Sequence, residues 1–236
     1  MSKNYKRLHV FGDSYSTPNN CVTPEHSYWG LAAQSLGSNT VANYSWPGNS
    51  VTSIFHTLIS LQTTFSWETD YFLIGIPPLE RLTVFDNHKH TQYNFKQFDT
   101  ASWKEISHKL NCHTGLQNIP TWQADKLVLY SDRSWTETEI LGKLFLLTSW
   151  LDSKQANYLI VNLSKPFDQN NVWAPTEFLL EWAIEHSKMC LFDDTYYSVN
   201  ENINQPVDFD THGWFGHHGP AGNKHFFETT LKNKLC

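Results

Sequence analysis

Residues 7–18 read RLHVFGDSYSTP, an apolar stretch that stops abruptly at a Gly-Asp-Ser tripeptide. A short apolar run that ends in turn-forming residues is typical of a buried strand, so we predict a strand over residues 6–12. Ser14 would then stand just beyond the end of that strand. Two hypotheses follow: Ser14 is a nucleophile mounted at the strand end, or the tripeptide is only a turn.

Strands and helices alternate along most of the remaining chain. Further strands are predicted over residues 40–45, 70–76, 157–164 and 189–192. Helices are predicted over residues 23–37, 50–65, 136–155, 174–188 and 223–235. Such alternation predicts an α/β fold, a three-layer α/β/α sandwich around a mostly parallel five-stranded sheet. Ligands of such folds bind beyond the carboxyl ends of the strands, where Ser14 is expected to lie.

The helix predicted over residues 23–37 has the clearest boundaries. Thr23 is expected to be its N-cap, Pro24 occupies the first helical position, and Gly37 stands just past its end.

Residues 82–135 interrupt the alternation, because they are polar and show little helical or strand periodicity. Such a segment would struggle to form a core of its own, so we predict an insertion or lid over the site. Residues 1–236 are therefore expected to form a single domain.

The composition argues against several classes of partner. The chain carries 17 Lys and Arg against 23 Asp and Glu, a net charge of -6, and it has no basic stripe for a phosphate backbone. Nucleic acid is therefore not an expected partner. No secretory signal and no long apolar run is evident, so we expect a cytoplasmic protein without a membrane partner. The 4 cysteines are widely spaced and predict neither a zinc knuckle nor a dense disulfide framework.

Four blocks of sequence together resemble the SGNH or GDSL hydrolase family. They are Gly12-Asp13-Ser14, the lone Gly48 in NYSWPGNS, a turn that begins with Gly75 after the third strand, and a C-terminal His followed by Gly222 and a helix. The resemblance covers nearly the whole chain in block order. It implies the flavodoxin-like α/β/α fold of that family and hydrolysis of esters by a Ser-His-Asp triad, with no cofactor and no metal.

The resemblance implies that Ser14 is the nucleophile and that the Gly48 N–H helps to stabilise the oxyanion. A serine hydroxyl needs a base to remove its proton, and the developing oxyanion needs donors already aimed at it. The alternative for Gly48 is an ordinary turn after Pro47.

The third block departs from the family pattern. Family members usually have Gly-x-Asn-Asp there, and the Asn side chain is a further oxyanion donor, whereas this chain has Gly75-Ile76-Pro77-Pro78. Either the oxyanion hole has two donors, or Asn49 or Arg81 supplies the third. Arg81 is equally compatible with a surface position.

The base and its orienting acid lie in a stretched version of the last block. His217 is favoured as the base because Gly222 follows it by five residues and a helix opens there, and His218 is the second candidate. Asp210 is the nearest candidate acid, with Asp208 and Asp194 as alternates.

The 12 histidines leave a metal-dependent hydrolase open as an alternative. It would use the histidine-rich segments NHKH (87–90) and HGWFGHH (212–218). A catalytically impaired protein that binds a glycan through the Trp-rich insertion is a third hypothesis, because the third block is altered. The favoured prediction is a serine esterase or acyl hydrolase that forms an acyl-enzyme on Ser14. Its partner would be a small-molecule or carbohydrate ester, with an O-acetylated carbohydrate as a special case.

Overall fold

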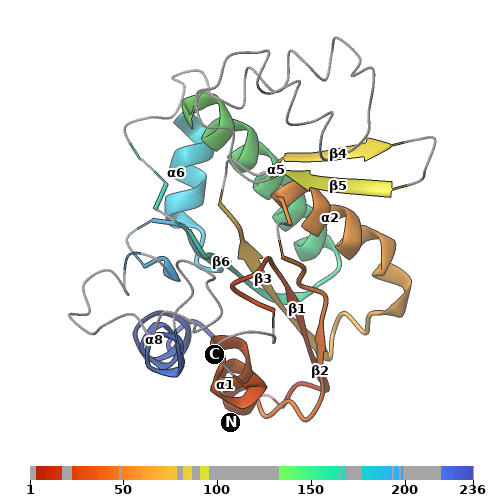
Figure 1. Ribbon diagram of the computed structural model, residues 1–236, viewed down its shortest axis with the longest axis vertical. Helices are drawn as coiled ribbons and strands as arrows, with labels where there is room; N and C mark the ends of the chain where they lie inside the picture. The colour runs from red at the N-terminus through yellow and green to blue at the C-terminus, as the bar shows by residue number, and fades with distance from the viewer. Residues whose placement is uncertain are drawn as a thin grey trace.

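The protein is described from a computed structural model (Figure 1). It describes residues 4–17, 23–47, 49–78, 82–86, 91–95, 133–164, 166–167, 169, 177–192, 194–196, 198 and 219–235, and only the backbone of residues 82–86, 91–95 and 133–135.

The centre of the fold is a parallel sheet of five strands in the order β2-β1-β3-β6-β7. The strands are β1 (Arg7–Phe11), β2 (Val41–Asn43), β3 (Asp70–Ile76), β6 (Asn157–Asn162) and β7 (Met189–Cys190). All neighbouring pairs are parallel, and β3 is buried along its whole length, as its continuous apolar sequence predicts. The predicted three-layer α/β/α fold with a five-stranded sheet is confirmed.

Helices cover both faces of this sheet, and the sheet separates two apolar cores (Figure 1). One face carries α2 (Val51–Ser60), α5 (Arg133–Ser153) and α6 (Glu177–Glu185), and a 3-10 turn, η2 (Gln62–Thr64), follows α2. The other face carries α1 (Tyr28–Ser35) and α8 (Pro220–Phe226), which a π-helical segment, η4 (Phe227–Leu231), extends. Each helix packs an apolar side onto the sheet, and this packing fixes the strand ends at which the candidate site lies.

The predicted first helix is divided in two, contrary to the boundaries expected from sequence. Pro24–His26 forms a 3-10 turn, η1, and the α-helix begins only at Tyr28. Ser27 is the N-cap of α1, because its hydroxyl accepts a hydrogen bond from the Gly30 N–H at 3.0 Å. Thr23 makes no side-chain cap bond, so its predicted role as the cap of the long helix was wrong.

The predicted insertion contains two strands that its polar composition did not indicate. Strands β4 (Leu82–Asp86) and β5 (Thr91–Phe95) form an antiparallel hairpin. The hairpin lies near α2 in Figure 1. Its sequence is rich in β-branched and aromatic residues, namely Thr83, Val84, Phe85, Tyr93 and Phe95, and this signal would have predicted strands.

Within the described residues, no helix is long and apolar enough to cross a lipid bilayer.

Candidate active site

Ser14 lies in a tight turn directly after β1, at the carboxyl edge of the sheet. The Ser16 N–H donates to the Asp13 carbonyl at 3.0 Å, and the Tyr15 N–H donates to Asp13 Oδ1 at 3.1 Å. The Thr17 hydroxyl donates to the Ser14 carbonyl at 2.8 Å. Asp13 is fully buried, whereas Ser14 is half-buried. The turn is thus held from within, and Ser14, the predicted nucleophile, is partly exposed on it together with Tyr15 and Thr17.

Gly12 is required by the packing of this turn. A Cβ at position 12 would lie 2.3 Å from Ser16 Oγ and 3.4 Å from Ser45 Oγ. Any side chain there would push Ser16 away and distort the turn that carries Ser14. The glycine of the Gly-Asp-Ser tripeptide therefore has a steric role in the structure.

The loop between β2 and α2 is fastened to the same turn through one carbonyl group. The Gly12 oxygen accepts the Trp46 N–H at 3.3 Å and Asn49 Nδ2 at 2.9 Å. Asn49 is buried, and its Oδ1 accepts the Ser53 hydroxyl of α2 at 2.9 Å. Asn49 therefore lies at the predicted site, where its carboxamide joins the turn that carries Ser14 to the start of α2.

Three further residues of this region were missed from sequence. Asn43 donates to the Ser16 carbonyl at 2.7 Å and accepts the Ser45 N–H at 2.9 Å, so it also ties the two loops together. The Ser45 hydroxyl is buried and has no hydrogen-bond partner among the residues that the structure describes. Trp46 has an exposed side chain. An Asn at the end of a strand that precedes a loop containing Pro47 and Gly48 is the sequence signal that could have found Asn43.

Beneath the turn, Ser16 is hydrogen-bonded to the hydroxyl of Tyr28, which is the first residue of α1. Tyr28 is fully buried, and this burial raises the pKa of its phenol above the ordinary value. Tyr28 is therefore a neutral structural support for the turn.

Gly75, the glycine of the third block, stands where the chain packs too closely for a side chain. A Cβ at Gly75 would lie 2.4 Å from Leu163 Cδ1 and 3.4 Å from the Phe11 carbonyl oxygen. Gly75 thus allows β3 to lie close to the end of β1 and to the residue after β6. Neither Pro77 nor Pro78 carries an N–H, so this block offers no backbone donor at those positions.

Most of the other predicted site residues lie outside the described residues: Gly48, Arg81, Asp208, Asp210, His217 and His218. Asp194, the alternate acid, is described. Its carboxylate is ion-paired with Lys234 at 3.0 Å, and its backbone carbonyl accepts the Thr230 hydroxyl at 3.2 Å. The structure thus attaches Asp194 to the C-terminal segment.

The histidine-rich segments of the metal hypothesis, 87–90 and 212–218, also lie outside the described residues. Among the residues that are described, no group of three or more His, Cys, Asp or Glu side chains is arranged to hold a metal ion.

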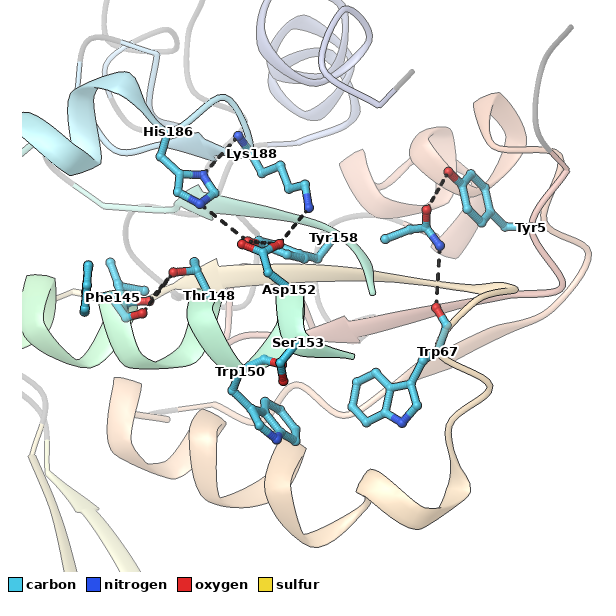
Figure 2. Close-up of polar contacts among 12 residues, drawn as sticks. Tyr5, Trp67, Phe145, Thr148, Trp150, Asp152, Ser153, Tyr158, His186 and Lys188 are labelled. Atoms are coloured by element: carbon cyan, nitrogen blue, oxygen red, sulfur yellow. Dashed lines mark hydrogen bonds and ion pairs between the residues drawn. The ribbon is translucent and has the colours of Figure 1, made fainter. Parts of the chain in front are cut away.

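A polar cluster at the opposite, amino edge of the sheet brings together Asp152, Tyr158, His186 and Lys188 (Figure 2). Asp152 Oδ1 accepts hydrogen bonds from the Tyr158 hydroxyl at 3.1 Å and from Lys188 Nζ at 2.9 Å. Burial lowers the pKa of His186 despite the neighbouring carboxylate. This cluster joins the end of α5 to the starts of β6 and β7.

Searches of protein-family profiles and of curated proteins find no match to the chain. Solved structures do resemble it. One is phospholipase A1 from Streptomyces albidoflavus NA297, with a TM-score of 0.48 and 15% identity over 98% of this chain and 99% of that one. Another is a lipolytic protein of the G-D-S-L family from Veillonella parvula DSM 2008, with a TM-score of 0.47 and 15% identity over 94% of each chain. A variant of the acetyl-xylooligosaccharide esterase Axe2 from Geobacillus has a TM-score of 0.43 and 13% identity over 99% of this chain and 96% of that one.

Proposed function

We propose that the protein is a serine hydrolase of the SGNH or GDSL type that cleaves carboxylic esters through an acyl-enzyme on Ser14. The observation that carries this proposal is the placement of Ser14. It lies half-buried on an internally bonded turn at the carboxyl edge of a parallel sheet. No hydrogen bond joins its hydroxyl to another of the residues described here, which suits a group that must reach a substrate.

The proposed reaction has two steps. Ser14 Oγ attacks the ester carbonyl carbon while His217 takes the hydroxyl proton, and the Ser14 and Gly48 N–H groups stabilise the oxyanion. The alcohol leaves with that proton, and the acyl group stays on Ser14. Water then attacks the acyl-enzyme with His217 again as the base, which releases the acid and restores the serine. Asp210 would orient the imidazole, with Asp208 or Asp194 as alternates.

The contacts of Gly12 and Asn49 support this proposal over the hypothesis of a simple turn. A turn alone requires only residues that tolerate its backbone conformation, whereas Gly12 and Asn49 position the turn against a second loop. Both loops stand at the edge where ligands of such sheets bind. The two alternatives, a metal-dependent hydrolase and a catalytically impaired glycan-binding protein, make different predictions for a Ser14 variant.

Turnover of short chromogenic esters by wild type and Ser14→Ala, with and without a chelator, tests the proposal. We expect chelator-resistant hydrolysis that falls by at least about 10³-fold in Ser14→Ala, because the nucleophile is lost. Ser35→Ala, at an exposed position of α1, is the matched control and should keep wild-type activity. Urea unfolding of each variant checks that the fold is retained.

A covalent probe gives a second readout that does not depend on the choice of ester. A fluorophosphonate should add to the Ser14 peptide, as found by mass spectrometry, and labelling should disappear in Ser14→Ala but not in Ser35→Ala. Chelator-sensitive activity that survives Ser14→Ala would instead establish the metal-dependent mechanism. A protein that binds glycans but neither turns over esters nor takes up the probe would establish the binding protein.

A further inference from the structure

Trp46 differs from the other tryptophans whose side chains the structure describes. Its side chain is 68% exposed. The others are buried or half-buried and pack in the two cores: Trp29, Trp67, Trp150 and Trp182. Tryptophan contributes a large apolar area when it is buried, so an exposed one forgoes that stabilisation. Among these tryptophans, Trp46 alone offers its ring to a ligand in solution.

The backbone that carries Trp46 is fixed on both sides. Its N–H donates to the Gly12 carbonyl at 3.3 Å, and its carbonyl accepts the Asn49 N–H at 3.1 Å. Two residues earlier, the Tyr44 N–H donates to the Val10 carbonyl at 2.8 Å. Pro47 follows directly and restricts the conformation of the residue before it. The indole is thus presented to solvent from a rigid backbone, so little conformational entropy would be lost when a ligand covers it.

Trp46 also stands close to the proposed nucleophile. It bonds to Gly12, and the chain covers the two residues from Gly12 to Ser14 in at most about 7 Å. The backbone of Trp46 therefore lies at the same edge of the sheet as Ser14, so one ligand of a few sugar units could span the two residues. By contrast, an apolar cavity of about 350 Å³ lies between α2 and α5, toward the amino edge of the sheet and away from Ser14. Its lining includes Phe55, Ile59, Leu146 and Trp150.

We propose that Trp46 is the platform on which the sugar ring of a carbohydrate ester stacks, an inference that rests on the proposed ester hydrolysis. A sugar ring presents C–H groups on its face and hydroxyl groups around its rim. The face can cover the exposed indole while the rim stays in water, which suits a flat and open aromatic surface. A long acyl chain needs an enclosed apolar channel to leave water, and an exposed single ring does not supply one.

The test compares two acetyl esters that differ only in the alcohol: acetylated xylobiose, which has sugar rings, and triacetin, which has none. Acetate release is followed for wild type, Trp46→Ala and Trp46→Phe. We expect Trp46→Ala to lower the ratio of kcat/KM for acetylated xylobiose to kcat/KM for triacetin by about tenfold, mainly through a higher KM. Trp46→Phe keeps a flat ring and should restore most of that ratio.

Ile184→Ala is the matched control, because Ile184 is also exposed and apolar but lies at the far end of α6. It should leave the ratio at the wild-type value. An equal loss of kcat/KM on both esters in Trp46→Ala would show a structural role for the indole. An unchanged ratio with no loss would show that the indole does not contact the sugar. Either result overturns the proposal.

A binding measurement separates this proposal from the proposed function. Calorimetric titration of Ser14→Ala with xylobiose should give an affinity about tenfold higher than the same titration of the Ser14→Ala/Trp46→Ala double variant. If wild type hydrolyses triacetin but no xylobiose binding depends on Trp46, the proposed sugar platform is wrong and the proposed ester hydrolysis is retained. If neither ester is hydrolysed but xylobiose binding depends on Trp46, the proposed ester hydrolysis is wrong and the proposed sugar platform is retained.

Discussion

Asn49 has a different role in the structure from the one that the sequence suggests. The sequence suggests it as a replacement for the missing oxyanion donor of the third block. In the structure its carboxamide donates to the Gly12 carbonyl and accepts the Ser53 hydroxyl, both at 2.9 Å, in a buried position. Its first role is therefore to hold the turn of Ser14 against α2. Its role as a donor to substrate stays a prediction.

We predict that Asn49→Ala lowers both stability and kcat. The buried Gly12 carbonyl and Ser53 hydroxyl would lose partners, which costs about 1–3 kcal/mol in the free energy of unfolding. Displacement of Ser14, or loss of an oxyanion donor, should lower kcat by about 10²–10³-fold with little change in KM. Urea unfolding and ester hydrolysis measure the two effects.

Asn49→Asp tests the N–H donors of Asn49, because it keeps the size and the acceptor oxygen but removes those donors. We expect it to be as slow as Asn49→Ala. An unchanged kcat in both variants would show that Asn49 neither positions Ser14 nor contacts the oxyanion, and a two-donor oxyanion hole would then be the better account.

At the scale of elements, the junction of η1 and α1 depends on one close contact. A Cβ at Gly30 would lie 1.9 Å from the Pro24 carbonyl oxygen, a backbone atom that cannot turn aside. The 3-10 turn can therefore fold back onto the first turn of α1 only because residue 30 is glycine. This packing also places Tyr28 beneath the turn that carries Ser14, where its hydroxyl bonds to Ser16.

We predict that Gly30→Ala destabilises the protein by about 1–3 kcal/mol or more, because the new methyl group overlaps backbone. Gly142→Ala is the matched comparison. It lies within α5, and the nearest atom to an added Cβ is Leu179 Cδ1 at 4.0 Å. Alanine should stabilise a helix interior by about 0.5–1 kcal/mol there. Urea midpoints for the two variants should move in opposite directions, and a shift of the same sign in both would contradict this account.

The same elements show what the sequence can and cannot predict. Buried strands such as β3 are recognisable because their apolar run is uninterrupted and ends at Pro77. The start of α1 is not, because Thr23-Pro24 and Ser27 are both good helix starts and only the contact between Gly30 and Pro24 decides between them. The turn of Ser14 is local and was predicted. The bonds of Asn43 and Asn49 join separate loops, which local patterns do not specify.

At the scale of the whole molecule, the two cores meet at the sheet, and one titratable pair is buried there. His9 of β1 is fully buried, lies parallel to the ring of Phe72 with centroids 5.1 Å apart, and hydrogen-bonds through Nε2 to Asp70 Oδ2 at 2.9 Å. Burial lowers the pKa of His9, and the partly opposing effect of Asp70 does not offset it. Arg7, on the same strand, lowers it further.

We predict that stability falls as the pH drops below about 6.5, the ordinary pKa of histidine. With a depressed pKa in the folded state, His9 takes up its proton more readily in the unfolded chain, so acid favours unfolding. The slope from this residue can reach about 1.4 kcal/mol per pH unit. Urea unfolding between pH 5 and 8 measures it.

His9→Gln should remove this part of the slope, whatever its effect on stability at pH 8, and the exposed His56→Gln should not. An undiminished slope in His9→Gln would assign the acid sensitivity to other groups, such as His186, whose pKa is also lowered by burial.

Helices α1 and α8 are held together by Asn223, whose Oδ1 accepts the Tyr28 N–H at 3.0 Å across 195 residues of sequence. During translation at 5–20 residues per second, roughly 10–40 s pass between the synthesis of these two partners. For that time the apolar face of α1, with Tyr28, Ala32 and Leu36, lacks the helix that covers it. The turn that carries Ser14 is thus synthesised well before α8, yet its support is complete only when α8 emerges. Nascent chains that stall before α8 should therefore remain inactive and depend on chaperones.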